Sequence, residues 1–100
     1  MPAYYLFDVR EITDYDMMNR YRKAVLATVE QFGGRYLAVG GEISIIEGDW
    51  RPEFPVLIEF PSAKHARDWY ASPEYGQIKD LRLRGTRGHA ILLDAAPFAA

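Results

Sequence analysis

Four segments of the chain show strand-like patterns. Residues 3–10 (AYYLFDVR) alternate a more apolar face with a mixed one, as expected for a half-buried strand. Residues 35–47 predict a second strand or an interrupted one, because Gly40-Gly41 falls within the segment and favours a bend or a bulge. The short apolar run at residues 56–60 is typical of a central strand, and residues 89–94 predict the last one.

Two longer segments repeat their apolar residues every three or four positions, which predicts amphipathic helices. Thr13 is expected to cap the first helix, and Gly33 is expected to end it. Ser62 is expected to cap the second helix, which breaks and restarts at Ser72. The apolar stripe of the first helix consists of Met18, Tyr21, Val25, Val29 and Phe32.

The order strand, helix, strand, strand, helix, strand predicts a ferredoxin-like βαββαβ fold of the α+β class, with helices on one face of an antiparallel sheet. The length suits a single domain, residues 1–100, with one core. The strands are apolar on both faces, as Tyr4, Leu6, Val39 and Leu57 illustrate. A monomer would leave the second face open to water, so we predict a homodimer packed sheet to sheet.

Composition narrows the classes of function. Twelve basic and fourteen acidic residues give a net charge of -2, which argues against a nucleic-acid-binding protein. Cysteine is absent, so thiolate catalysis, disulfides and sulfur-ligated metals are excluded. No segment approaches the roughly 18 consecutive apolar residues of a membrane-spanning helix. With no secretory leader pattern either, we expect a cytoplasmic protein that makes no membrane contact.

The loop between the second and third strands carries much of a family resemblance. The segments GGRY (33–36), GG (40–41), EGDWRP (47–52), VLIEFPS (56–62) and SPEY (72–75), with Arg82, together resemble the domain-of-unknown-function family 1330. This resemblance implies a dimeric α+β barrel, in which ferredoxin-like subunits pair through their sheets. It implies no activity, because the family has none assigned. Distant relatives of that barrel include cofactor-free monooxygenases and ligand-sensing domains, which is an analogy of fold alone.

Glu59 is a candidate for chemistry because it places a carboxylate inside the apolar VLIEF strand. A carboxylate in a central strand needs a partner or has a raised pKa. Arg82 is the expected partner, since a guanidinium binds a carboxylate through two hydrogen bonds. The pair is either a structural lock, the commoner role of such pairs, or a catalytic acid beside an anion anchor.

Three further side chains are candidates, each with a structural alternative. His65 precedes Asp68 by three residues, so it is either a general base oriented by a carboxylate or part of an exposed helix pair. Tyr21 either fills the core or donates its hydroxyl into a pocket. Trp50 either covers a ligand pocket or packs over the dimer seam. The two histidines, His65 and His89, form no helical metal motif, and no metal site is expected.

Two functions are compatible with these residues. The first is a cofactor-independent enzyme that transfers a proton on a small acidic or aromatic organic molecule, with no metal, flavin or nucleotide. Its catalytic candidates are Tyr21, Glu59 and His65, and its ligand-binding candidates are Arg82 and Trp50. The alternative is a non-catalytic ligand-binding or structural dimer. A cavity that Arg82 shares with a titratable side chain would favour the enzyme, whereas hydrogen bonds among Glu59, Arg82 and Tyr21 would favour the alternative.

Overall fold

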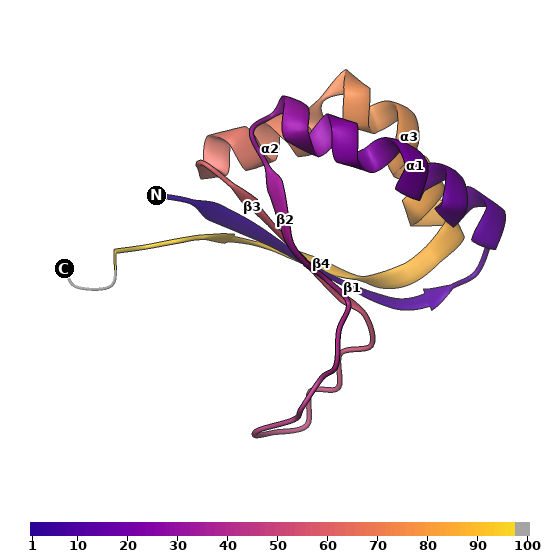
Figure 1. Cartoon of the computed structure of the whole chain (residues 1–100), viewed down its shortest axis with the longest axis vertical. Coiled ribbons are helices and arrows are strands. Elements are labelled where there is room, and N and C mark those ends of the chain that lie inside the picture. The colour runs from indigo at the N-terminus through magenta and orange to yellow at the C-terminus, as the bar shows by residue number, and fades with distance from the viewer. Residues whose placement is uncertain (98–100) are drawn as a thin grey trace.

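Four β-strands form a single antiparallel sheet in residues 1–97, the part of the chain that the computed structural model describes (Figure 1). The central strand β1 pairs with β3 on one side and with β4 on the other, and β2 continues the sheet beyond β3. At its centre, Tyr5 lies opposite Ile58 and Leu92. The strands are β1 (Ala3–Ile12), β2 (Arg35–Val39), β3 (Pro55–Phe60) and β4 (Thr86–Asp94).

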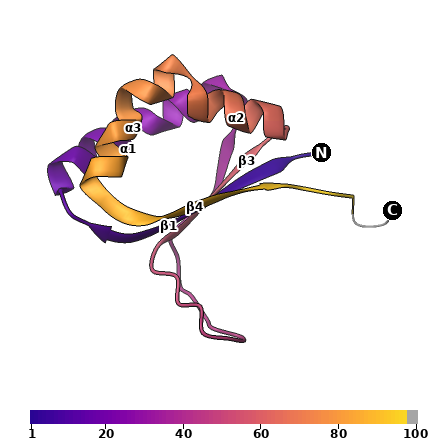
Figure 2. The ribbon, with the colours of Figure 1, turned by 180° about the vertical axis from the view of Figure 1, so that it is seen from behind.

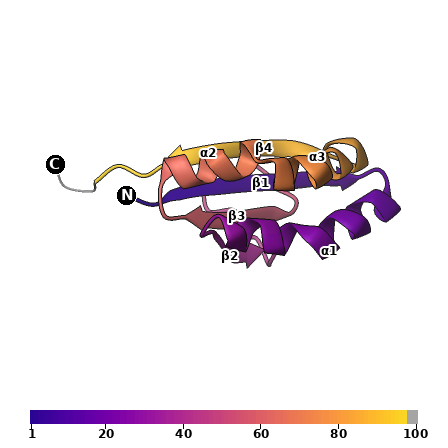
Figure 3. The same cartoon turned by 90° about the horizontal axis from the view of Figure 1, so that it is seen from above.

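Three helices cover one face of this sheet and leave the other face open (Figure 1, Figure 2). They are α1 (Tyr15–Gln31), α2 (Ala63–Ala71) and α3 (Pro73–Gly85). Seen from above, α2 and α3 run along the β4 and β1 side, and α1 runs along the β2 side (Figure 3). This element order and this strand order confirm the predicted ferredoxin-like α+β fold. None of the helices in residues 1–97 is both long and apolar enough to cross a membrane, and the expected cytoplasmic location stays a prediction.

The helix ends follow the predicted capping residues, with one correction. Ser62 and Ser72 accept hydrogen bonds from the backbone N–H groups of His65 and Tyr75, as N-caps do. The first helix, however, is capped by Asp14, whose Oδ1 accepts from the N–H of Met17 at 3.0 Å. The prediction of Thr13 as the cap was wrong by one residue, because a carboxylate favours the positive helix end more strongly than a hydroxyl does.

The prediction of a strand across residues 35–47 was also wrong in its second half. β2 ends at Val39, and residues 40–54 form a loop that projects beyond the open face of the sheet (Figure 1). Gly40 and Gly41 adopt φ angles of +69° and +136°, which L side chains rarely adopt, and turn the chain out of the sheet. At Gly40 the ring of Phe54 packs so closely that a Cβ atom would lie 2.5 Å from it.

The core lies between the helices and the covered face of the sheet, and aromatic rings dominate it. Trp69 is fully buried at its centre, with its ring 4.1 Å from that of Tyr75 and 5.4 Å from those of Tyr5 and Phe60, centre to centre. The predicted stripe of the first helix is confirmed for Met18, Tyr21, Val25 and Val29, which are all buried, whereas Phe32 lies just beyond α1 and is half-buried.

The open face of the sheet is apolar over much of its area. On β4, Ile91 and Leu93 are 60% and 58% exposed, and they lie opposite Leu6 and Tyr4 of β1. In the projecting loop, Ile46 is 86% exposed. An apolar sheet face of this kind is uncommon on a protein that acts as a monomer.

Candidate functional site

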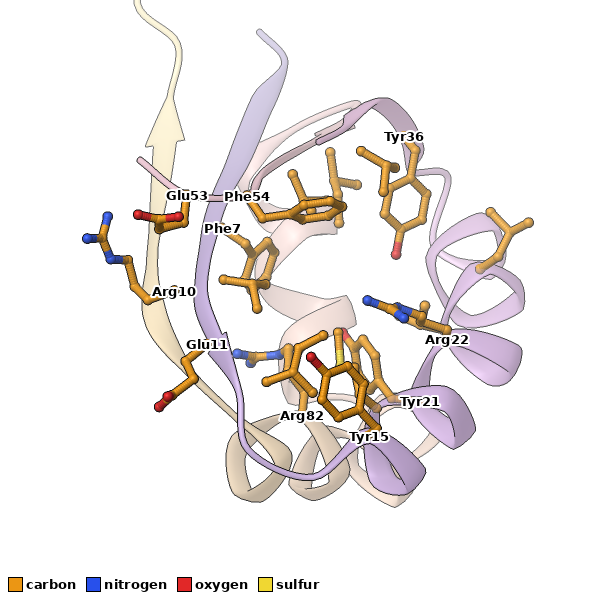
Figure 4. Close-up of a pocket in the computed structure, with 18 residues that line it drawn as sticks. Phe7, Arg10, Glu11, Tyr15, Tyr21, Arg22, Tyr36, Glu53, Phe54 and Arg82 are labelled. Atoms are coloured by element: carbon orange, nitrogen blue, oxygen red, sulfur yellow. The ribbon is translucent and has the colours of Figure 1, made fainter. Parts of the chain in front are cut away.

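A cavity of about 960 Å³ lies between α1 and the covered face of the sheet. It exists because α1 packs mainly against α3 and makes few contacts with the strands, so the helix stands away from β2 and β3. The walls come from β1, β2, β3 and α1, and Arg82 reaches in from α3 (Figure 4). The volume is within the usual range of about 300–1,000 Å³ for small-molecule sites.

Arg82 is half-buried at the inner wall of the cavity. Its Cζ lies 5.0 Å from the centre of the Phe7 ring, and its Nε and Nη2 donate to the hydroxyls of Tyr75 and Tyr70 at 3.2 and 3.4 Å. Burial works to lower the pKa of Arg82, but the neighbouring phenols, Tyr75 foremost, outweigh it and raise the pKa, so the group stays charged. No ion pair among residues 1–97 includes Arg82.

Tyrosine hydroxyls add neutral hydrogen-bonding groups: Tyr21 and Tyr36 line the cavity, and Tyr75 is fully buried behind the lining. The Tyr21 and Tyr75 hydroxyl oxygens lie 2.9 Å apart and share a hydrogen bond. Burial and the Tyr75 hydroxyl raise the pKa of Tyr21 far above its usual value. Burial also raises the pKa of Tyr36, to about 12, with a further contribution from Tyr75. At neutral pH these phenols therefore keep their protons and act as hydrogen-bond donors.

Several lining side chains of the cavity are exposed to solvent, among them Tyr15 at 67% and Phe54 at 39%. Figure 4 shows Tyr36 projecting its hydroxyl into the cavity from β2, and Arg22 directing its guanidinium into it from α1. Charged residues at the edge, Arg10, Glu11 and Glu53, lie on the far side of β1 from these groups (Figure 4). The inner surface thus combines guanidinium groups, phenolic hydroxyls and apolar side chains.

Glu59 lies outside the cavity, and the predicted pair with Arg82 was wrong. Its side chain is on the open face of the sheet, where Arg35 of the neighbouring strand donates from Nε to Oε1 at 2.8 Å. Arg35, together with the Tyr4 hydroxyl, lowers the pKa of Glu59. The alternation of the strand decides this, because Glu59 points away from the helices while Arg82 comes from the helical layer.

His65 and Trp50 also lie outside the cavity. His65 is exposed near the start of α2, and its Nδ1 is 2.7 Å from the Ser62 hydroxyl. The expected pair with Asp68 was wrong, because Asp68 instead binds Lys64, four residues before it, at 2.7 Å. Trp50 is 63% exposed, beside a hollow of about 120 Å³ on the open face that it shares with Leu6, Asp8, His89, Ala90 and Ile91. Of the predicted site residues, the cavity brings together only Tyr21 and Arg82.

Two residues of the cavity, Tyr36 and Arg22, were missed from the sequence. Tyr36 lies opposite Ile58, whose side chain is buried, but this pairing of β2 with β3 could not be predicted from the sequence. For Arg22 a signal existed. Arg22 lies four residues after Met18 and three before Val25, so a charge borders the apolar stripe of the helix. Among residues 1–97, no three His, Asp or Glu side chains are grouped to hold a metal ion.

The fold is similar to several solved structures. The protein of unknown function RPA0582 from Rhodopseudomonas palustris superposes with a TM-score of 0.74 at 17% identity, over 96% of this chain and 83% of that chain. Rv0793 from Mycobacterium tuberculosis gives a TM-score of 0.58 at 14% identity, over 100% of both chains. A putative antibiotic biosynthesis monooxygenase from Nitrosomonas europaea gives 0.56 at 11% identity, over 98% of this chain and 90% of that chain. At these identities the likeness concerns the fold alone.

A match at the level of sequence places the chain in a family. No curated protein matches the sequence. The family model described as a domain of unknown function, DUF1330, matches residues 2–96, which is nearly the whole chain and includes every wall of the cavity. The resemblance noted in the glycine pairs and the EGDWRP loop is thereby confirmed, and the chain belongs to the DUF1330 family.

Proposed function

We propose that this protein binds a small organic acid in the cavity between α1 and the sheet. The anionic group of the ligand binds the Arg82 guanidinium and accepts hydrogen bonds from the phenolic hydroxyls nearby. The remainder of the ligand, aromatic or aliphatic, packs on Phe7 and the apolar walls. Sites for small molecules commonly combine such walls with a few convergent polar groups.

The observation that carries this proposal is the guanidinium of Arg82, half-buried at a cavity wall and without a carboxylate partner among residues 1–97. A desolvated charge is costly unless an opposite charge or strong acceptors compensate it. Two phenol oxygens supply acceptors, at the long distances of 3.2 and 3.4 Å. An anionic ligand supplies the missing charge, and this favours binding of acids over neutral molecules.

Proton transfer on the bound molecule is the second candidate function. It is supported by Tyr21, whose hydroxyl is joined to Arg82 through Tyr75 and whose side chain lines the cavity. Its raised pKa keeps the hydroxyl protonated at neutral pH, which suits a hydrogen-bond donor and makes proton transfer harder. Glu59 and His65 lie outside the cavity, so the catalytic roles expected of them have no support from the geometry. Arg82 does share the cavity with the titratable Tyr21, but that phenol holds its proton too tightly to act as an acid or a base at neutral pH. Binding is therefore the function that we favour.

Arg82→Met is expected to weaken binding of organic acids at least about tenfold, because a hydrogen bond to a charged group contributes about 1.5–3 kcal/mol. Methionine retains most of the length and the packing against Phe7. The measurement is a thermal-shift screen of carboxylic acids, followed by calorimetry of the hits. Arg84→Met removes an exposed guanidinium from the same helix, outside the cavity, and should leave affinity unchanged. Equal losses in both variants would mean that the acids bind elsewhere.

We also propose that the protein is a homodimer that buries the open face of the sheet. The exposed side chains of Ile91 and Leu93, continuous with Leu6 and Leu57 on the neighbouring strands, form the apolar surface that supports this. Trp50 borders the same surface, and the dimer seam is the role we propose for it. The occupant we propose is a second copy of this chain, since a twofold axis would pair this apolar face with the same face of the second copy.

Ile91→Lys is expected to convert the dimer to a monomer, because it places a charge in an apolar interface. One chain has a mass of 11.5 kDa. Light scattering at micromolar concentration should give twice that mass for the unmodified protein and the mass of one chain for the variant. Leu83→Lys adds the same charge at a residue that is 53% exposed on α3 and should leave the dimer intact. A mass of 11.5 kDa for the unmodified protein would refute the dimer.

A further inference from the structure

The cavity carries a second guanidinium, and the proposed function does not use it. Arg22 lies on α1 and directs its side chain into the cavity from that wall (Figure 4). Arg82 lies against Phe7 of β1, which belongs to the sheet side of the cavity. The two positive groups therefore belong to opposite walls, one on the helix and one beside the sheet.

Neighbouring carboxylates do not neutralise these two groups. No ion pair among residues 1–97 includes Arg22 or Arg82. Of the other charges on the cavity lining, Arg10 binds Asp8 at 3.1 Å and Glu11 binds Arg87 at 2.8 Å. Glu53 lies beside Arg10, beyond β1 from the two cavity guanidinia (Figure 4). The positive charges directed into the cavity are those of Arg22 and Arg82.

The lining between these two groups is largely apolar. Met18 and Val25 of α1 face Val56 and Ile58 of β3 across the volume of about 960 Å³. Near Arg22, Tyr36 projects its hydroxyl toward the guanidinium (Figure 4). Each guanidinium thus has a phenol beside it: Tyr36 lies on the lining near Arg22, and Tyr75, buried behind the lining, accepts a hydrogen bond from Arg82.

We propose that the ligand is an organic dianion, with two carboxylates or equivalent anionic groups separated by an apolar spacer. One anionic group binds Arg82 and the other binds Arg22, where the Tyr36 hydroxyl donates a further hydrogen bond. Arg22 is then the residue that distinguishes a dianion from a monoanion. This inference rests on the proposed binding of organic acids in the same cavity and names the class of acid.

The test compares each dicarboxylate with a monocarboxylate of the same carbon number or ring. Adipate is paired with hexanoate, suberate with octanoate, and terephthalate with benzoate. Calorimetry at low ionic strength measures the affinity of the full chain for each. We expect at least one dicarboxylate to bind about fivefold more tightly than its partner, the size of effect typical of an additional partly exposed ion pair. High salt should reduce the ratio of dicarboxylate to monocarboxylate affinity, since screening by salt weakens exposed ion pairs most.

Two variants assign the effect to Arg22. Arg22→Gln keeps much of the side-chain length and should bring the ratio of dicarboxylate to monocarboxylate affinity close to one, because it weakens dicarboxylate binding more than monocarboxylate binding. Lys23→Gln removes the neighbouring positive charge of α1, which does not line the cavity, and should leave the ratio as it is. Thermal unfolding of both variants confirms that the fold is retained.

The outcomes separate this inference from the proposed function. If monocarboxylates bind as tightly as dicarboxylates and Arg82→Met abolishes both, the organic-acid site stands and the dianion is wrong. If Arg22→Gln and Lys23→Gln lower the ratio equally, general attraction explains the preference and Arg22 has no specific role. If neither series binds the unmodified protein, both the dianion and the organic-acid site are refuted.

Discussion

Trp69→Ala is expected to lower the free energy of unfolding by about 3–5 kcal/mol, the cost typical of truncating a large buried aromatic residue. Trp69 is fully buried, packs against Tyr5, Phe60 and Tyr75, and leaves a space that those rings cannot easily fill. The loss is a large part of the stability of a small domain, commonly about 5–15 kcal/mol. Urea unfolding followed by circular dichroism, at one fixed protein concentration, measures it.

Two variants bracket that result. Trp69→Phe retains a ring but loses the hydrogen bond from Nε1 to the Thr28 hydroxyl at 3.0 Å, and should cost about 1–2 kcal/mol. Leu83→Ala, at an exposed position of α3, should change stability by no more than about 0.5 kcal/mol. A cost below 1 kcal/mol for Trp69→Ala would contradict the packing described around this side chain.

Asp8→Ala is expected to have the next largest effect on stability, about 2–4 kcal/mol. The Asp8 side chain is 6% exposed, and its Oδ1 accepts from the backbone N–H groups of Glu53 and Phe54 at 2.9 and 3.0 Å. Its Oδ2 accepts from Arg10 at 3.1 Å. The carboxylate thereby ties the end of the 40–54 loop to β1, and with it Phe54, which lines the cavity. Hydrogen exchange of the Glu53 and Phe54 amides should accelerate in the variant.

Asp8→Asn separates the charge of this carboxylate from its hydrogen bonds. The asparagine Oδ1 still accepts from the two backbone N–H groups, so the variant should lose about half as much stability as Asp8→Ala, chiefly through the pair with Arg10. Equal losses in the two variants would mean that the negative charge, rather than the loop hydrogen bonds, provides the stability.

The contribution of Asp8 should depend on pH in a defined direction. Burial alone would raise the pKa of Asp8, but hydrogen bonds from Phe54 and Glu53 and the Arg10 guanidinium outweigh it and hold the pKa below its usual value. A carboxyl with a lowered pKa in the folded state stabilises the fold above its unfolded pKa of about 3.9 and loses that contribution as pH falls through its folded value. The stability difference between the unmodified protein and Asp8→Asn should therefore shrink below about pH 4. A difference that stays constant would contradict this assignment.

The sequence predicted the elements better than the site. Spacing along α1 identified its buried residues, since one face of an amphipathic helix is buried whatever it packs against. The alternation of side chains along β3 indicated that Glu59 and Ile58 face opposite sides of the sheet. That alternation did not indicate which basic residue would form an ion pair with Glu59. Arg35 meets it because β2 lies beside β3, a neighbour relation that no local pattern encodes.

The distinction has a physical reason. Periodicity, capping residues and the glycines near residue 40 act over a few positions, so the sequence by itself determined the βαββαβ order, the burial of Tyr21 and the apolar character of both sheet faces. The cavity depends on how far α1 stands from the sheet, and packing between helices distant in sequence sets that distance. Only the tertiary structure therefore decided that Arg82 and Tyr21 share a cavity with Arg22 and Tyr36, and that Glu59, His65 and Trp50 lie outside it.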